Sequence, residues 1–128
     1  MPTRILVDTN FLLIPIRFKV DIFTLSADAV NDLTEFYVSS RVLDEIQRLK
    51  EKSKPSFVKE LRFAETFAGQ CTLIDDPSDG EVDDSLVSLA RREAMVLGTS
   101  DAELRQKARA AGVKVLYLRQ QSYLVLDG

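Results

Sequence analysis

The sequence predicts an α/β fold built around a mostly parallel sheet. Five apolar runs are spaced along the chain as expected for strands, at about 4–8, 35–38, 71–74, 95–99 and 113–118. Helical patterns fall between these runs, and strands that alternate with helices are typical of parallel sheets. Turn and capping residues at the junctions are the third observation, because they separate each strand from the helix that follows.

The expected helices cover about 17–34, 41–52, 55–69, 81–92 and 101–111. The first of them has the least distinct ends. Asp79 can cap the fourth helix, and Ser100 with Glu103 three residues later has the capping-box pattern at the start of the fifth. The segment 122–128 is either a short edge strand or a docked tail.

The composition restricts the chemistry that is available. The chain has 128 residues, of which 45% are apolar, so we expect a single domain over residues 1–128 with a substantial core. No apolar stretch is long enough to span a bilayer. Cys71 has no partner for an internal disulfide, which favours a cytoplasmic location. Histidine is absent, so a hydrolytic site must use carboxylates, hydroxyls, amines or a metal ion held by oxygen.

Charge is unevenly distributed, although the net charge is only −3. Residues 48–62 carry six basic side chains against two acidic ones, whereas residues 75–84 carry six acidic side chains and no basic one. The two segments are either separate solvated surfaces or a basic arm beside an acidic pocket.

Helical geometry singles out one acidic residue in the second expected helix. Each helical residue advances about 100° around the axis. Val42, Ile46 and Leu49 then form an apolar stripe. Glu45 lies at the edge of this stripe, whereas its neighbour Asp44 points toward solvent.

The same geometry singles out two more acidic residues. In the fourth expected helix, Asp83 falls on the part of the helix surface that carries the apolar residues, and Asp84 falls outside it. In the fifth, Asp101 projects on the same side as Ala108, whereas Glu103 points away. Asp83 and Asp101 are therefore expected to face inward.

A fourth acid, Asp8, ends the first apolar run within the stretch VDTN at residues 7–10. A buried carboxylate without a partner is costly, so such groups are usually paired or metal-bound. Each acid also has a structural alternative. Asp8 can cap the following turn, Glu45 can pair with a nearby base, and Asp83 and Asp101 suit the first turn of a helix. However, three of the four lie at strand ends or helix starts, where open α/β sheets form their ligand crevice.

Four short motifs, in this order, resemble those of the PIN-domain nucleases. They are VDTN at 7–10, VLDE at 42–45, DDSL at 83–86 and TSDAEL at 99–104, and they cover nearly the whole chain. The stretch DTNFLLIPIRFKVDIF at 8–23 is further similar to the archaeal and eukaryotic PIN proteins of small-subunit ribosomal RNA processing. It resembles the stand-alone toxin branch less closely.

The resemblance implies a three-layer α/β/α sandwich with a mostly parallel five-stranded sheet, and a metal-dependent endoribonuclease that cleaves single-stranded RNA. One or two Mg²⁺ or Mn²⁺ ions would be held by the acidic quartet Asp8, Glu45, Asp83 and Asp101, which are also the implied catalytic residues. Asp8 and Asp101 are expected as direct ligands, and Asp83 as a ligand directly or through water. Glu45 would bind a second ion or orient the attacking water. Asn10, Thr99 and Glu103 are the implied supporting positions.

The expected partners follow from this activity. Single-stranded RNA would be bound by the basic residues Arg48, Lys50, Lys52 and Lys54. A role in ribosomal RNA processing implies a ribosome-assembly factor as partner, whereas the toxin-type alternative implies an antitoxin. A homodimer is left open, and no membrane partner is expected.

Three other interpretations remain. A receiver-type phosphoacceptor domain also has an acid after its first strand and a threonine after its fourth, but here Thr9 replaces its second acid and Arg119 its lysine. A phosphatase with an Asp-x-Asp nucleophile is weakened because Asn10 replaces the second aspartate. The third is a PIN fold that binds RNA or acts as a scaffold without cleaving.

Overall fold

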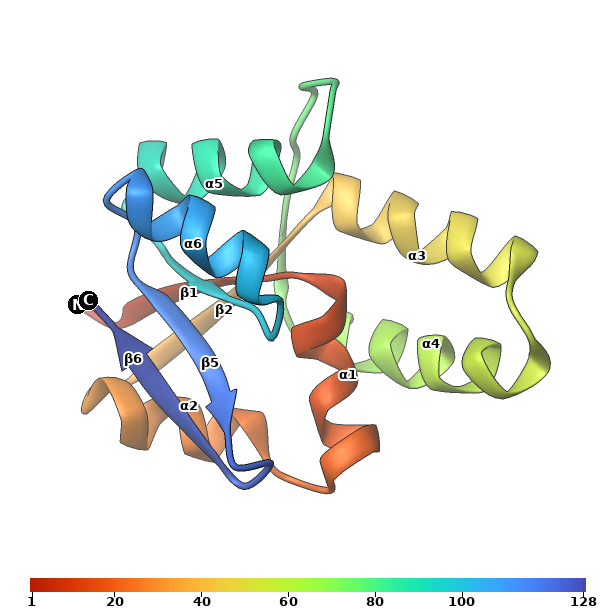
Figure 1. The fold of residues 1–128 in the computed structure, drawn as a ribbon, viewed down its shortest axis with the longest axis horizontal. Helices are drawn as coiled ribbons and strands as arrows, with labels where there is room; N and C mark the ends of the chain where they lie inside the picture. Colours follow the sequence, from red (N-terminus) through yellow and green to blue (C-terminus); the bar gives the residue numbers. More distant parts are fainter.

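The computed structural model describes all 128 residues and shows a six-stranded sheet between two layers of helices (Figure 1). The strands are β1 (Thr3–Val7), β2 (Thr34–Ser39), β3 (Thr72–Ile74), β4 (Val96–Gly98), β5 (Val115–Arg119) and β6 (Tyr123–Asp127). The helices are α1 (Thr9–Phe18), α2 (Ile22–Val30), α3 (Ser40–Lys52), α4 (Pro55–Ala68), α5 (Val82–Arg92) and α6 (Ala102–Ala110). The predicted α/β/α architecture is confirmed.

The sheet has the strand order β3-β2-β1-β4-β5-β6. All neighbouring strands are parallel except β5 and β6, which pair antiparallel. The five strands expected from the apolar runs form the parallel part. The segment 122–128 contributes the antiparallel edge strand, so the sheet has one strand more than predicted.

The strand order creates a switch point between β1 and β4. From β1 the chain adds β2 and β3 on one side, and then returns to add β4 and β5 on the other. Val7 and Gly98 are the last paired residues of the two central strands. Open parallel sheets bind ligands beside the C-terminal strand ends at such a point. Asp8 and residues 99–101, which follow β1 and β4, therefore lie where a ligand is expected.

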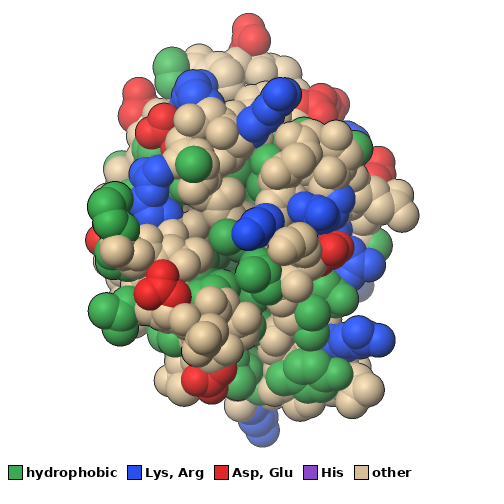
Figure 2. Space-filling model, turned by 90° about the vertical axis from the view of Figure 1, so that its left-hand side faces the viewer, with side chains coloured by type: hydrophobic (Ala, Val, Ile, Leu, Met, Phe, Trp, Pro, Cys, Tyr) green, Lys and Arg blue, Asp and Glu red, His purple; other side chains and the backbone are tan.

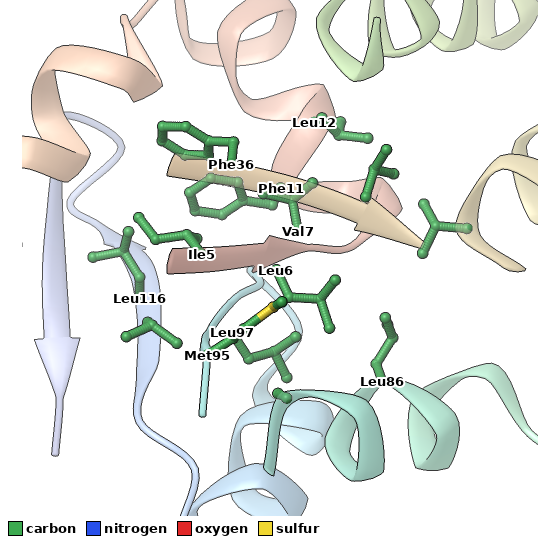
Figure 3. Close-up of a cluster of buried hydrophobic side chains, with 14 of the residues drawn as sticks. Ile5, Leu6, Val7, Phe11, Leu12, Phe36, Leu86, Met95, Leu97 and Leu116 are labelled. Atoms are coloured by element: carbon green, nitrogen blue, oxygen red, sulfur yellow. The ribbon is translucent and has the colours of Figure 1, made fainter. Parts of the chain in front are cut away.

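β1 is buried on both faces because helices cover both sides of the sheet. The last three residues of β1 have no exposed surface. Phe11 and Phe36 lie on one side of this strand, and Leu86 and Met95 lie on the other (Figure 3). The two-sided packing fixes the end of β1, and with it the position of Asp8.

The helix expected over 17–34 is wrong in its boundaries. Two helices occur there: α1 begins directly after Asp8, and α2 ends before β2. Lys19, in a left-handed conformation with φ 55°, ends α1, and Asp21 then caps α2 through two backbone N–H groups. Pro15 lies inside α1. It obscured this helix in the sequence, because proline normally interrupts a helix interior.

Two expected helix caps are also wrong. α5 follows Glu81, whose side chain makes no capping hydrogen bond, and does not follow Asp79. α6 is capped by Asp101, whose carboxylate accepts hydrogen bonds from two backbone N–H groups of the first turn. Ser100 lies one residue too early for this role, and its own backbone N–H donates to Asn10.

Gly98 allows α1 to approach the sheet closely. A Cβ atom at this position would lie 3.2 Å from three ring atoms of Phe11. We expect Gly98→Ala to displace this ring and to lower the free energy of unfolding by about 1–2 kcal/mol. Phe11→Leu supplies the control, because Gly98→Ala should cost much less when the ring is absent. An equal change in denaturation midpoint with and without the ring would contradict the packing argument.

The side of the molecule that carries the chain ends shows interspersed basic, acidic and apolar side chains (Figure 2). Charges of one sign do not gather on this side. None of the helices combines the length and the apolar character that a membrane crossing requires.

Candidate active site

Asp8 lies at the centre of the switch point. Its Oδ1 accepts a hydrogen bond from the backbone N–H of Phe11 at 2.8 Å, so Asp8 caps α1. Its Oδ2 accepts a hydrogen bond from the hydroxyl of Thr99. The residue is only 6% exposed and has no basic partner within ion-pair distance. The capping role considered as an alternative is present, and it leaves a buried, oriented carboxylate.

Asn10 and Thr99 hold the loop after β4 against Asp8. Asn10 Oδ1 accepts a hydrogen bond from the backbone N–H of Ser100 at 2.8 Å and a second from the Thr99 hydroxyl at 3.3 Å. Thr99 Oγ1 accepts a hydrogen bond from the backbone N–H of Asp101 at 3.1 Å. These contacts set the position of Asp101 relative to Asp8.

Thr9 belongs to the site, although the sequence analysis did not select it. Its hydroxyl donates to Glu45 Oε1 at 2.6 Å and ties the first turn of α1 to α3. No basic side chain pairs with Glu45, so the ion pair considered as its alternative is not formed. The periodicity of α1 would have pointed to Thr9, but Pro15 obscured that helix.

The orientations expected for the acids of the three helices are confirmed by their exposure. The acids expected to face inward are half-buried: Glu45, Asp83 and Asp101. The acids expected to face outward are exposed: Asp44, Asp84 and Glu103. Glu103 was implied as a supporting position; it makes no side-chain contact with the quartet and acts on Asp83 through its charge.

The four acids influence one another electrostatically. Burial raises the pKa of Asp8 to about 7, opposed by the hydrogen bonds from Thr99 and Phe11 and reinforced by the charges of Asp83 and Glu45. Burial also raises the pKa of Asp83, and the charge of Asp101 is its next largest cause. Carboxylates from four segments of the chain therefore converge on one region of negative potential.

The donor set suits a hard divalent cation, because carboxylate and hydroxyl oxygens are the ligands that Mg²⁺ and Mn²⁺ prefer. Burial is the main cause of the raised pKa values of Asp8 and Asp83, and a cation would offset both this burial and the smaller repulsion between the carboxylates. No three acidic side chains lie close enough together to form a closed set of metal ligands. The donor chemistry of the site fits a metal ion, whose coordination would be completed by water and phosphate oxygens.

The other acids of the region serve structural roles. Asp76, which is buried, accepts hydrogen bonds from the Ser78 hydroxyl at 2.7 Å and the Ser85 hydroxyl at 3.0 Å. Asp84 lies 3.5 Å from the ammonium group of Lys107. The acidic run at 75–84 therefore divides into Asp83, which faces the site, and residues that hold the loop or face solvent.

The comparison with known families extends over most of the chain. Residues 5–121 match the family described as the PIN like domain. This chain belongs to the PIN-like domain family. The motifs that suggested the resemblance in the sequence lie within the matched region.

Two curated relatives align with nearly all of this PIN domain. Ribonuclease VapC9 of Archaeoglobus fulgidus is 27% identical over 126 residues, which cover 94% of this chain and 87% of the relative. Ribonuclease VapC4 of Methanocaldococcus jannaschii is 25% identical over 130 residues, which cover 98% and 97%.

Solved structures support the PIN fold. The PIN domain endonuclease Utp24 has a TM-score of 0.79 and 20% identity, with 98% of this chain and 92% of that chain covered. VapBC2 of Rickettsia felis, bound to a DNA fragment from its promoter, has a TM-score of 0.61 and 18% identity, with 82% and 92% covered. At these identities the likeness establishes the fold alone.

The basic segment of the PIN domain divides into side chains with different surroundings. Lys50 pairs with Glu65 at 2.7 Å and is only partly exposed. Lys52 and Lys54 are exposed at the junction of α3 and α4, away from the acids. Arg48 lies nearer the acids and lines a surface hollow with Glu45.

Proposed function

We propose that this PIN domain is a metal-dependent endoribonuclease that cleaves single-stranded RNA. The observation that carries the proposal is the convergence of Asp8, Glu45, Asp83 and Asp101 at the switch point of the sheet. Burial raises the pKa of the Asp8 carboxyl, and the charges of Asp83 and Glu45 add to this rise. The ribonuclease class of the prediction is supported by the family match and by both curated relatives.

We assign a role to each acidic residue of the site. Asp8 and Asp101 would be direct ligands of Mg²⁺ or Mn²⁺, and Asp83 would bind directly or through water. Glu45, positioned by the Thr9 hydroxyl, would orient the attacking water or hold a second ion. Bound there, the metal would lower the pKa of a water molecule and offset charge on the phosphate.

The remaining polar residues orient the ligands. The Thr99 hydroxyl donates a hydrogen bond to the Asp8 carboxylate and accepts one from the backbone N–H of Asp101. One hydroxyl therefore connects the two residues that we propose as direct ligands. Asn10 restrains this hydroxyl and the following peptide. Partners of this kind fix the rotamers of metal ligands and typically change affinity or activity 10–100-fold when removed.

The cellular role has two candidates. The similarity of residues 8–23 to ribosomal RNA-processing PIN proteins favours a partner in ribosome assembly, and the fold of Utp24 is similar. The two sequence relatives named VapC, and a VapBC2 complex among the structural relatives, favour an antitoxin partner. An adjacent gene whose product binds and inhibits the protein would establish the second role. Association with pre-ribosomal particles would establish the first.

A cleavage assay tests the proposed activity. Single-stranded RNA should be cut internally in Mg²⁺ or Mn²⁺, duplex RNA should be resistant, and excess chelator should stop the reaction. RNA binding without cleavage in either metal would support the non-catalytic alternative and would contradict the proposed activity.

The exposed lysines allow a separate prediction about RNA binding. Charge reversal at Lys50, Lys52 and Lys54 together should weaken RNA binding at low salt, and each lost phosphate contact should reduce the logarithmic salt slope by about 0.7. Lys50→Glu alone should mainly lower stability, because it places a like charge beside Glu65. Binding titrations over a range of salt concentrations measure the slope. An unchanged slope would make this segment an ordinary solvated surface.

A further inference from the structure

A surface hollow of about 370 Å³ lies between α3 and the start of α5. The first turns of these helices are neighbours in space (Figure 1), and the Arg41 side chain of α3 donates to the carbonyl oxygen of Gly80, in the loop before α5. The hollow is lined by two arginines, Arg41 and Arg48, as well as by Glu45 and Asp83 of the acidic quartet. It is therefore continuous with the proposed active site.

The two arginines flank Glu45 on one face of α3. Arg41, Glu45 and Arg48 have the spacing i, i+4, i+7, which places their side chains along a single helical stripe. Neither arginine forms an ion pair, although the carboxylates of Glu45, Glu81 and Asp83 line the same hollow. Neither guanidinium charge is therefore neutralised by a direct contact with a carboxylate.

Arg41 presents an unsatisfied donor. Its Nη2 donates to the carbonyl oxygen of Gly80 at 2.6 Å, which anchors the guanidinium group at the rim. Its Nη1 is buried and has no hydrogen-bond partner. A buried donor without a partner is costly, and the guanidinium fork, once turned toward the hollow, would match the paired oxygens of a phosphate. The contact with Gly80 accounts for Nη2 but leaves Nη1 unexplained.

We infer that this hollow binds an RNA backbone phosphate beside the cleavage site, through Arg41 and Arg48. We call this binding site the phosphate seat. The inference rests on the proposed function and adds the direction in which the RNA leaves the acids, toward α3. Phosphate is repelled by a cluster of carboxylates, so a site that receives RNA needs nearby positive charge. Arg41 and Arg48 supply it within the hollow, whereas Lys52 and Lys54 lie farther along α3 and its loop.

Binding measurements with single-residue variants test the seat. A short fluorescent oligouridylate would be titrated in chelator, so that no cleavage occurs, with the wild type, Arg41→Gln and Arg48→Gln. Each variant should bind about tenfold more weakly, the loss of one charged hydrogen bond, and its logarithmic salt slope should fall by about 0.7. Arg91→Gln is the control of equal charge change, because Arg91 is exposed at the other end of α5.

The arginine variants also separate a phosphate seat from a loop tether. Arg41→Lys should keep most of the salt slope but lose the affinity that comes from the fork. If Arg41→Gln lowers the melting temperature while Arg48→Gln binds RNA like the wild type, Arg41 is only a tether of Gly80 and the inference is wrong. Binding by both glutamine variants that equals the Arg91→Gln control, or no RNA binding by the wild type, would overturn it as well.

Cleavage measured on the same preparations distinguishes this inference from the proposed function. If the wild type binds RNA through Arg41 and Arg48 but cuts nothing in Mg²⁺ or Mn²⁺, the seat stands and the nuclease proposal fails. If the wild type cuts RNA and both variants keep its KM and kcat, the nuclease proposal stands and the seat is wrong. A raised KM with a similar kcat is the result expected of a residue that mainly binds substrate.

Discussion

Asp8→Asn is expected to reduce RNA cleavage by at least about a thousandfold, which corresponds to about 4 kcal/mol of transition-state stabilisation. The substitution removes a negative charge from the centre of the site. It should preserve the fold, because the asparagine carbonyl can still accept the hydrogen bond from Phe11 and its amide can donate to Thr99. Single-turnover cleavage in Mg²⁺ and in Mn²⁺ measures the loss, and circular dichroism checks the fold.

The control for this variant is Asp44→Asn. It changes the net charge by the same amount, but Asp44 is exposed and points away from the site. Its cleavage rate should stay within about twofold of the wild type, because the substitution should leave the stabilisation of the transition state nearly unchanged. An Asp8→Asn protein that remains folded and fully active would leave Asp8 only as the cap of α1.

The second large effect concerns stability in the absence of metal. The pKa of Asp8 is about 7 in the folded protein and about 3.9 in an unfolded chain. Between these values the folded state keeps a proton that the unfolded state has lost. Rising pH therefore destabilises the wild type through this residue. The loss should approach, as an upper bound, about 4 kcal/mol by pH 7 relative to Asp8→Asn.

Denaturation in chelator measures this difference. Wild type and Asp8→Asn should be similar in stability near pH 4, and the variant should be more stable near pH 7. Mg²⁺ or Mn²⁺ should narrow this difference, because an ion at a hundredfold excess over its dissociation constant stabilises the folded wild type by about 2.7 kcal/mol and the variant by less. A variant that is less stable at every pH, together with a wild type that does not respond to metal, would contradict the metal site.

The sequence predicted the sheet because each parallel strand contains a short apolar run and helical patterns separate these runs. β1 and β4 are buried on both faces, so their apolar runs can be recognised in the sequence without knowing which strands pair with them. The edge strand β6 was less certain, because an edge strand needs less apolar surface. Its existence depends on the pairing with β5, which is a tertiary contact.

Three of the four acids could be selected by helical phase alone, and Asp8 by its place at the end of the first apolar run. Glu45 and Asp83 share an apolar face with core residues, and their exposed neighbours Asp44 and Asp84 show how sharply one residue changes the direction of a side chain. The direction of a side chain around its own helix does not predict which side chains of another helix it contacts. Thr9 reaches Glu45 only because α1, which the sequence placed too late, crosses the start of α3.

The basic residues were the least predictable part of the site. Composition marked 48–62 as one basic arm, but Lys50 is neutralised by Glu65 on the neighbouring helix. Arg41 lies outside that segment and was not selected. The position of its side chain beside the acids depends on the hydrogen bond to Gly80. No local sequence pattern predicts how the loop at Gly80 folds.

The central claim, that the inward-facing acids hold a catalytic metal, is tested most directly by one pair of neighbours on α5. Cleavage of single-stranded RNA would be measured for Asp83→Asn and Asp84→Asn over a range of Mn²⁺ concentrations. Asp83→Asn should be inactive or should require much more metal. Asp84→Asn should match the wild type, since Asp84 is exposed and contacts only Lys107. Inactivation by Asp84→Asn together with wild-type activity in Asp83→Asn would contradict the account.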